Sequence, residues 1–193
     1  MNQEKVMVEI SARHVHVTQQ DLEILFGVGH QLTPKKNLSQ PGQYASEEKV
    51  DLVGAKSTIK NVSILGPVRK ATQVEVSLTD ARTLGVNALV RESGIIDGTF
   101  GITLVGPVGS IVLEKGVIAA KRHVHLDPKS AEAHGVHDKQ EVSVKVVSEN
   151  RSLVFGNVVI RINADFLPAM HIDTDEANAA GIVGSALGEI IVD

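Results

Sequence analysis

The chain contains no cysteine and no tryptophan in its 193 residues. The absence of cysteine excludes disulfide bonds, thiolate metal sites and a cysteine nucleophile. Aromatic residues make up 3% of the chain although 42% of it is hydrophobic, so the core must consist mainly of Val, Ile, Leu and Ala. Together with 17 glycines, this composition favours many short strands joined by tight turns.

Long apolar runs and basic clusters are also missing. No stretch approaches the ~18 apolar residues of a membrane-spanning helix, so no membrane partner is expected. The net charge is −4 and no basic block is present, which argues against nucleic acid as a partner. The start, Met1 to Lys5, is too short and polar for a signal peptide, and we expect a cytoplasmic protein. The length suits one large domain or two small ones.

Histidine, in contrast, follows a repeated pattern. Four of the eight histidines lie in two copies of Arg-His-Val-His, at 13–16 and 122–125. Each copy follows an apolar segment that favours a strand, and residues two apart in a strand point to the same face. The two histidines of each copy should therefore point together, as the ligands of a metal site do. Neutral imidazole is a common zinc ligand, so the duplication favours metal binding over polar positions that simply face solvent.

Each zinc site would need a further protein ligand and would keep one position open for substrate. Glu75 lies on the polar face of a predicted strand, and His171 interrupts an apolar stretch, so both are candidates. The alternatives are a solvated carboxylate for Glu75 and an ordinary core or surface residue for His171. Arg69 follows a Gly-Pro turn, and its planar guanidinium suits phosphate, although a surface arginine would have the same sequence context.

The distribution of alternating residues and turn residues predicts a mainly β chain with short helices. Residues 6–17 are predicted as one strand that runs into the first histidine pair, and residues 32–45 as a loop. Further strands are predicted at 49–53, 57–64, 72–78, 94–120 (two or three strands), 141–147, 153–162 and 189–192. Short helices are predicted at 21–26, 79–85, 127–135 and 173–181, with glycines at their ends. Strand, histidine pair, capped helix and more strands thus occur twice, which indicates two related β-barrels with helical caps.

Three functions fit some of these features. A dinuclear zinc hydrolase, including a thioester hydrolase, would use the same ligands to generate hydroxide. A cupin-like oxygenase also uses His-x-His, but no Glu follows either pair at three or four residues. A non-catalytic β-barrel would bind metal for structure or assembly.

Five blocks in the chain resemble the propanediol-utilisation type of phosphotransacylase, the phosphate propanoyltransferase family. The resemblance covers nearly the whole chain, and the blocks occur in the same order. They are SARHVH at 11–16, QPGQYA at 40–45, GPVR at 66–69 followed by QVE at 73–75, RHVH at 122–125, and HIDTDEA at 171–177.

The resemblance implies a mainly β fold of two interleaved β-barrels capped by short α-helices, with the active site between them. One barrel would comprise residues 3–12 plus 121–190, and the other residues 13–120. The site would hold two Zn²⁺ ions per chain. One zinc ion would be bound by His14, His16 and Glu75, with room for the sulfur of coenzyme A. The other would be bound by His123, His125 and His171, with room for water, phosphate or the acyl oxygen, and Arg69 would bind the phosphate.

The implied reaction interconverts a short-chain acyl-CoA plus phosphate with an acyl phosphate plus CoA, as in propanediol degradation. Propionyl-CoA and acetyl-CoA are both candidate substrates, and the sequence does not identify the residues that contact CoA. Some family members carry an N-terminal extension that targets a microcompartment, whereas only about five residues precede the first predicted strand here. A free cytoplasmic enzyme is therefore expected. A homo-oligomer and another metal such as cobalt stay open.

Overall fold

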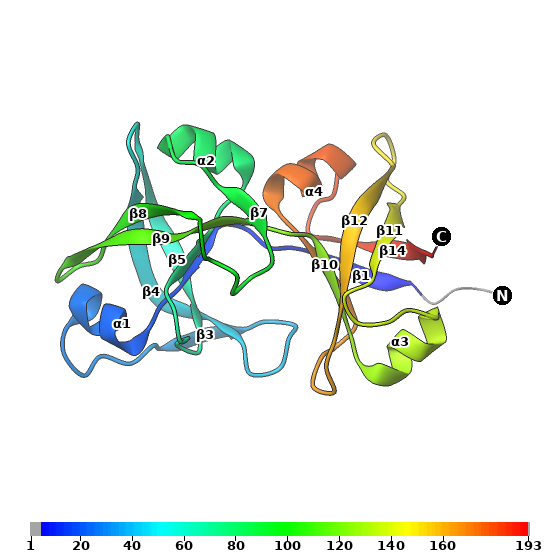
Figure 1. Cartoon of the computed structure of the whole chain (residues 1–193), viewed down its shortest axis with the longest axis horizontal. Coiled ribbons are helices and arrows are strands. Elements are labelled where there is room, and N and C mark those ends of the chain that lie inside the picture. The colour runs from blue at the N-terminus through cyan, green and yellow to red at the C-terminus, as the bar shows by residue number, and fades with distance from the viewer. Residues whose placement is uncertain (1–4, 193) are drawn as a thin grey trace. The chain divides into compact units, whose positions relative to one another are not determined.

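A computed structural model describes residues 5–192 of the chain. Residues 1–4 and 193, which include the first two positions of the predicted segment 3–12, lie outside this description. The described residues form fourteen strands and four short helices (Figure 1). The strands close into two barrels, which confirms the predicted mainly β fold of two interleaved barrels with short helical caps. Among the described residues, no helix is long and apolar enough to cross a membrane.

Barrel 1 combines one strand from the start of the chain with five from its last third. Its strands are β1 (Val6–Ile10), β10 (His123–Leu126), β11 (Glu141–Val146), β12 (Leu153–Ile162), β13 (Ala169–Ile172) and β14 (Ser185–Ile191). Their order around the barrel is β1-β13-β10-β12-β11-β14. The blue β1 pairs with the red β14 to close the ring (Figure 1). Inward-facing Val, Ile, Phe and Met side chains fill the interior, including Val8, Ile160 and Met170 with no exposed surface.

Barrel 2 is built from the middle of the chain. Its strands are β2 (His14–His16), β4 (Tyr44–Val53), β5 (Thr58–Gly66), β6 (Gln73–Glu75), β8 (Phe100–Val105) and β9 (Ser110–Ala120). The path β4-β5-β2-β6-β9 is closed by β8, which pairs with both β9 and β4. Two short strands, β3 (Pro34–Asn37) and β7 (Leu89–Arg91), add to β4 and β9 outside this ring. A second apolar core, separate from that of barrel 1, fills the interior.

The two barrels have the same topology. Starting from the strand with the histidine pair, the pairings around each ring follow the same order: antiparallel, parallel, three antiparallel, then parallel. In this correspondence β2 matches β10, β6 matches β13, and β9 matches β1. Because β9 leads directly into β10 of barrel 1, and β1 into β2 of barrel 2, each repeat contributes its leading strand to the other barrel.

Contacts divide the chain into two compact units that follow the barrels. One unit comprises residues 1–11, 39–41 and 121–193, and the other comprises residues 12–38 and 42–120. The short segment 39–41 belongs to the first unit, where the Gln40 side chain donates to the carbonyl oxygen of Leu167 over 3.0 Å. The domain boundaries predicted above, 3–12 plus 121–190 and 13–120, stay a prediction.

The four helices are short and capped by their own sequence. They are α1 (Gln19–Phe26), α2 (Leu78–Leu84), α3 (Pro128–His134) and α4 (Thr174–Ala180). Each is preceded by a Ser, Thr or Asp whose side chain accepts a backbone N–H of the first turn. Each is followed by a glycine, as the sequence predicts.

Several predicted elements differ from the structure. The single strand at 6–17 is two strands in different barrels, because Ser11 N–H still bonds to Ile172 of barrel 1 while His14 already pairs with Glu75 of barrel 2. The predicted loop at 32–45 contains β3, whose exposed residues show no alternation of burial. The predicted strand 72–78 ends at Glu75 because Ser77 caps α2 instead. The short strands β7 and β13 were not predicted.

Candidate metal centres

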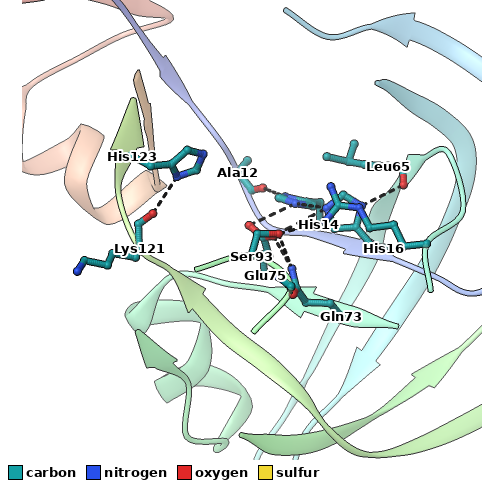
Figure 2. A network of polar contacts seen from close by, with 11 residues as sticks. Ala12, His14, His16, Leu65, Gln73, Glu75, Ser93, Lys121 and His123 are labelled. Carbon is teal, nitrogen blue, oxygen red and sulfur yellow. Dashed lines mark hydrogen bonds and ion pairs between the residues drawn. The ribbon is translucent and has the colours of Figure 1, made fainter. Parts of the chain in front are cut away.

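Three of the predicted ligands meet on two neighbouring strands of barrel 2, on the face opposite to the core residues Val15 and Val74. The alternation of β2 turns His14 and His16 to the same side, and the antiparallel pairing with β6 sets Glu75 opposite His14. All three are buried. The Nε2 atoms of His14 and His16 lie 3.2 Å apart, and they lie 3.5 and 3.8 Å from the two carboxylate oxygens of Glu75 (Figure 2).

Backbone carbonyl groups orient both imidazole rings. The Nδ1 atom of His14 lies 2.8 Å from the Ala12 oxygen, and that of His16 lies 3.2 Å from the Leu65 oxygen (Figure 2). Since a carbonyl oxygen can only accept, each Nδ1 carries a hydrogen, and each ring turns its Nε2 atom toward the other. Metal-bound histidines are commonly held in this way by their second nitrogen.

This donor set fits a zinc ion. Two lone pairs and a carboxylate that face one another repel unless they share a cation. Two nitrogens bound to a tetrahedral zinc lie roughly 3.3 Å apart at ordinary Zn–N distances. The 3.2 Å between the two Nε2 atoms agrees with that spacing.

The charges in this cluster also suit a metal ion. Burial alone would raise the pKa of Glu75, but His14 beside it and a hydrogen bond from Ser93 hold that pKa well below its usual range. Burial would likewise lower the pKa of His14, and the Glu75 carboxylate raises it instead. Burial, together with His14 and Arg69, lowers the pKa of His16 to about 3. At neutral pH the cluster therefore offers an anionic carboxylate and a neutral His16.

A second set of predicted ligands meets in barrel 1. His123 and His125 lie on β10, and His171 lies opposite His123 on β13. One nitrogen from each residue lies within 4.8 Å of the other two. The His123 Nδ1 atom lies 2.9 Å from the Lys121 oxygen, which repeats the contact of His14 with Ala12 (Figure 2).

The second cluster also fits a metal ion. Burial, and the nearby His123 and His171, lower the pKa of His125 to about 2, so this ring is neutral. Among the described residues, the buried Nδ1 of His125 has no hydrogen-bond partner. Three imidazoles that converge in this way, with His125 buried and His123 and His171 half-buried, are a common zinc-binding set.

The two clusters occupy equivalent positions in the two barrels. The strand register matches His14 with His123, His16 with His125, and Glu75 with His171. Only the last of these positions changes chemistry, from a carboxylate to an imidazole. Of the two clusters, the one in barrel 2 is thus the one with an acidic ligand.

Arg69 lies in barrel 2, on the turn that follows β5. Gly66 begins this turn because a Cβ atom there would lie 2.2 Å from the ring of Tyr44. The Arg69 backbone N–H donates to the Val17 oxygen over 2.8 Å, and its guanidinium Nη1 lies 3.1 Å from the Ser93 hydroxyl. The half-buried side chain lines a hollow of about 590 Å³ together with Lys70, Gln73, Gly94 and Ile96.

Comparison with known proteins assigns the chain to a family. A family model described as phosphate propanoyltransferase matches residues 7–183. A phosphate propanoyltransferase from Thermotoga maritima is 57% identical over 175 residues, covering 91% of this chain and 83% of the relative. The chain belongs to the phosphate propanoyltransferase family. Relatives of the same name from Clostridioides difficile and Salmonella typhimurium are 49% and 50% identical over 96% and 94% of the chain, covering 88% and 86% of the relatives.

Membership of the phosphate propanoyltransferase family confirms the resemblance drawn from the five sequence blocks. The structure brings six of the seven predicted site residues into two clusters of three. It adds Gln73 and Ser93, which both donate to Glu75. Gln73 could have been found from sequence, since it lies two residues before Glu75 on the same face of the strand. Ser93 follows the unpredicted β7, and no pattern in the sequence marks it.

Proposed function

We propose that this protein transfers a short acyl group, propionyl or acetyl, between coenzyme A and inorganic phosphate. Its family relatives are named for the propanoyl reaction. In the forward direction, a phosphate oxygen attacks the thioester carbonyl carbon, the C–S bond breaks, and CoA leaves as the thiolate. The observation that carries this proposal is the pair of equivalent ligand clusters, each with converging donor atoms.

The six clustered residues would hold two zinc ions. His14, His16 and Glu75 would hold one, near the CoA sulfur, and His123, His125 and His171 would hold the other, near the acyl oxygen or phosphate. Bound zinc supplies Lewis acidity toward the thioester carbonyl and affinity for the thiolate sulfur. The chain contributes rings and a carboxylate that are already oriented, so little reorganisation accompanies binding.

Arg69 would bind the phosphate. Its planar guanidinium can donate to two phosphate oxygens at once and offsets their charge. The contacts of its backbone with Val17 and of its side chain with Ser93 hold it in one orientation. Positioning the attacking phosphate in this way lowers the barrier to transfer. With no cysteine to form an acyl-enzyme, direct transfer in a ternary complex is the simplest sequence of steps.

Release of free thiol from propionyl-CoA and acetyl-CoA, with and without phosphate, tests this function. We expect thiol release that requires phosphate and disappears when metal is removed with a chelator. Equal release without phosphate would identify a thioester hydrolase instead. No release from folded, zinc-loaded protein would leave a non-catalytic metal-binding barrel. The ratio of the two substrates' rates would give the acyl preference.

A further inference from the structure

Ser93 lies where the side chains of Glu75, Gln73 and Arg69 converge. Its hydroxyl oxygen is 2.7 Å from Glu75 Oε1, 2.9 Å from Gln73 Nε2 and 3.1 Å from Arg69 Nη1 (Figure 2 shows the contacts with Glu75 and Gln73). A carboxylate only accepts, whereas an amide NH₂ and a guanidinium only donate. The Ser93 hydroxyl therefore donates to Glu75 and accepts from the other two, which uses its whole hydrogen-bonding capacity.

These contacts fix the orientation of the Glu75 carboxylate. Its Oε1 receives hydrogen bonds from Ser93 and, over 2.6 Å, from Gln73. Its Oε2 is the oxygen that lies 3.5 Å from His14 Nε2. Gln73 is held in turn, because its own oxygen accepts from the Gly94 backbone over 2.7 Å. The carboxylate is thus anchored through one oxygen and offers the other to the ligand cluster.

The hydroxyl also separates two opposite charges. Arg69 and Glu75 both contact Ser93, so a neutral hydroxyl lies between a guanidinium nitrogen and a carboxylate oxygen. A direct Arg–carboxylate pair would be a strong bidentate contact and would compete with a metal ion for the same oxygens. Ser93 thereby lets a cation-binding carboxylate and an anion-binding guanidinium work side by side within one barrel.

Among the described residues, the third ligand of barrel 1 has different partners: His171 Nδ1 lies 3.8 Å from Glu9, and Glu9 accepts a hydrogen bond from Ser39. Ser93 lies in the chain between α2 and β8, which also carries β7, whereas α4 leads to β14 through residues 181–184 alone. The strand register sets Ala169 of barrel 1 at the position of Gln73. The network therefore accompanies the one cluster that has a carboxylate ligand and a neighbouring Arg69.

We propose that Ser93 is a positioning residue that couples the carboxylate ligand Glu75 to the phosphate-binding Arg69. The coupling to Arg69 rests on the function proposed above, whereas the coupling to Glu75 does not require turnover. Removal of the hydroxyl would loosen Glu75 as a ligand and Arg69 as an anchor at the same time.

Metal competition tests the link to Glu75 without any assay of activity. Zinc-loaded wild type, Ser93→Ala and Ser93→Thr would be titrated with a chromophoric chelator. We expect one of the two zinc ions to be held roughly 10–100-fold more weakly in Ser93→Ala, as is typical when a partner of a metal ligand is removed. Ser93→Thr keeps the hydroxyl and should restore retention. Ser57→Ala, which removes a hydroxyl bonded to Thr83 in the same barrel, is the matched control and should match wild type. Equal zinc retention in Ser93→Ala and wild type would overturn the link.

Phosphate kinetics test the link to Arg69. Ser93→Ala should raise KM for phosphate about tenfold, the loss expected for one charge-assisted hydrogen bond. In an Arg69→Ala background the same change should leave KM for phosphate unaltered, while zinc retention still falls. Independent, additive effects on KM would rule out coupling through Arg69. If wild type itself shows no phosphate-dependent thiol release, the proposed function fails and the metal competition alone decides the role of Ser93.

Discussion

The first histidine of each pair owes its orientation to the carbonyl group two residues before it in the chain. His14 bonds to the Ala12 oxygen and His123 to the Lys121 oxygen, in matching positions of the two repeats. In both repeats this carbonyl group lies just before the strand that carries the histidines. The short segment before each strand therefore fixes the tautomer of the ring, and with it the nitrogen that faces the cluster.

Arg69→Ala is the most direct test of the proposed phosphate site. The substitution removes the guanidinium but none of the six candidate metal ligands. We expect kcat/KM for phosphate to fall on the order of 100-fold, as for loss of one strong charged contact, while zinc content stays the same. Steady-state kinetics and metal analysis would be compared with Arg82→Ala, an exposed arginine of barrel 2. Full activity of Arg69→Ala at low phosphate would make the assignment wrong.

Glu48 makes stability depend on pH. Burial would raise the pKa of this carboxyl, but hydrogen bonds from the Thr33 backbone and from His30 lower it below its usual value of 4.5. The stabilisation that these contacts of Glu48 give to the folded state is therefore complete above pH 4.5, and it is lost as the pH falls through the lowered folded-state pKa. We expect Glu48→Gln to have a lower Tm than wild type at neutral pH, and the difference to shrink toward pH 3. A difference in Tm that stays constant across this range would contradict the expectation.

At the scale of elements, the arginine before each histidine pair ties the strand to a helix. Arg13 makes two 2.8 Å contacts with Asp80, and Arg122 Nε lies 2.7 Å from Glu176. Both acids are the third residue of a helix that follows the strand with the third ligand, and both close a capping box. In each barrel, one ion pair thus links the strand that carries the histidine pair to the helix that follows the strand with the third ligand.

Neutralising these acids should destabilise both barrels. Asp80→Asn and Glu176→Gln each keep the side-chain shape but weaken the ion pair and the cap. Each should lower the free energy of unfolding by about 1–2 kcal/mol. Tm should fall by roughly 2–8 °C for a chain of this size. Asp97→Asn, whose partner Lys115 is exposed, is the control and should leave Tm unchanged. A Tm equal to wild type in both test variants would show that the ion pairs add nothing.

The sequence predicts elements well where one local signal decides them. Asp127, Pro128 and Gly135 mark both ends of α3, and the long alternating runs give β5 and β12. The sequence is a poor predictor of elements that form only because they pair with distant strands. The strands β6, β7 and β13 are three or four residues long, which is too short for a period to emerge. The third ligands Glu75 and His171 lie on two of these, so the sequence pattern made them candidates only, and the family resemblance assigned each of them to a metal site.

For the molecule as a whole, the exchange of β1 and β9 is the organising feature. Nothing in residues 6–17 marks the change of barrel, since the two strands are adjacent in sequence and no glycine or proline separates them. The duplicated Arg-His-Val-His motif correctly indicates two related barrels, but local patterns contain no information about which strands pair across more than a hundred residues. The interleaving came from the resemblance alone.

A circular permutant would test this arrangement. Because β14 and β1 pair in antiparallel fashion, a short glycine linker can join the two ends of the chain. If the new chain then starts at Ala12, the residues of each compact unit become nearly continuous in sequence. We expect such a protein to fold with a Tm close to that of wild type and to retain two zinc ions. The control is a second permutant with the same linker, whose new termini lie between Glu149 and Asn150 in an exposed turn. Aggregation of the first permutant alone would show that the link between β1 and β2 is essential for folding.

The pairing of β1 with β14 has a consequence for synthesis on the ribosome. Barrel 2 has all its strands once Ala120 has emerged, but barrel 1 cannot close until Ile191 has been made. At about 5–20 residues per second, roughly 180 residues take on the order of 10–40 s. Throughout that time the first strand made, with its apolar Val6 and Val8, waits for a partner that is made last. The nascent chain would therefore expose an unpaired strand for most of its synthesis. The yield of folded protein in the cell should then depend on how well that strand is protected from neighbouring chains.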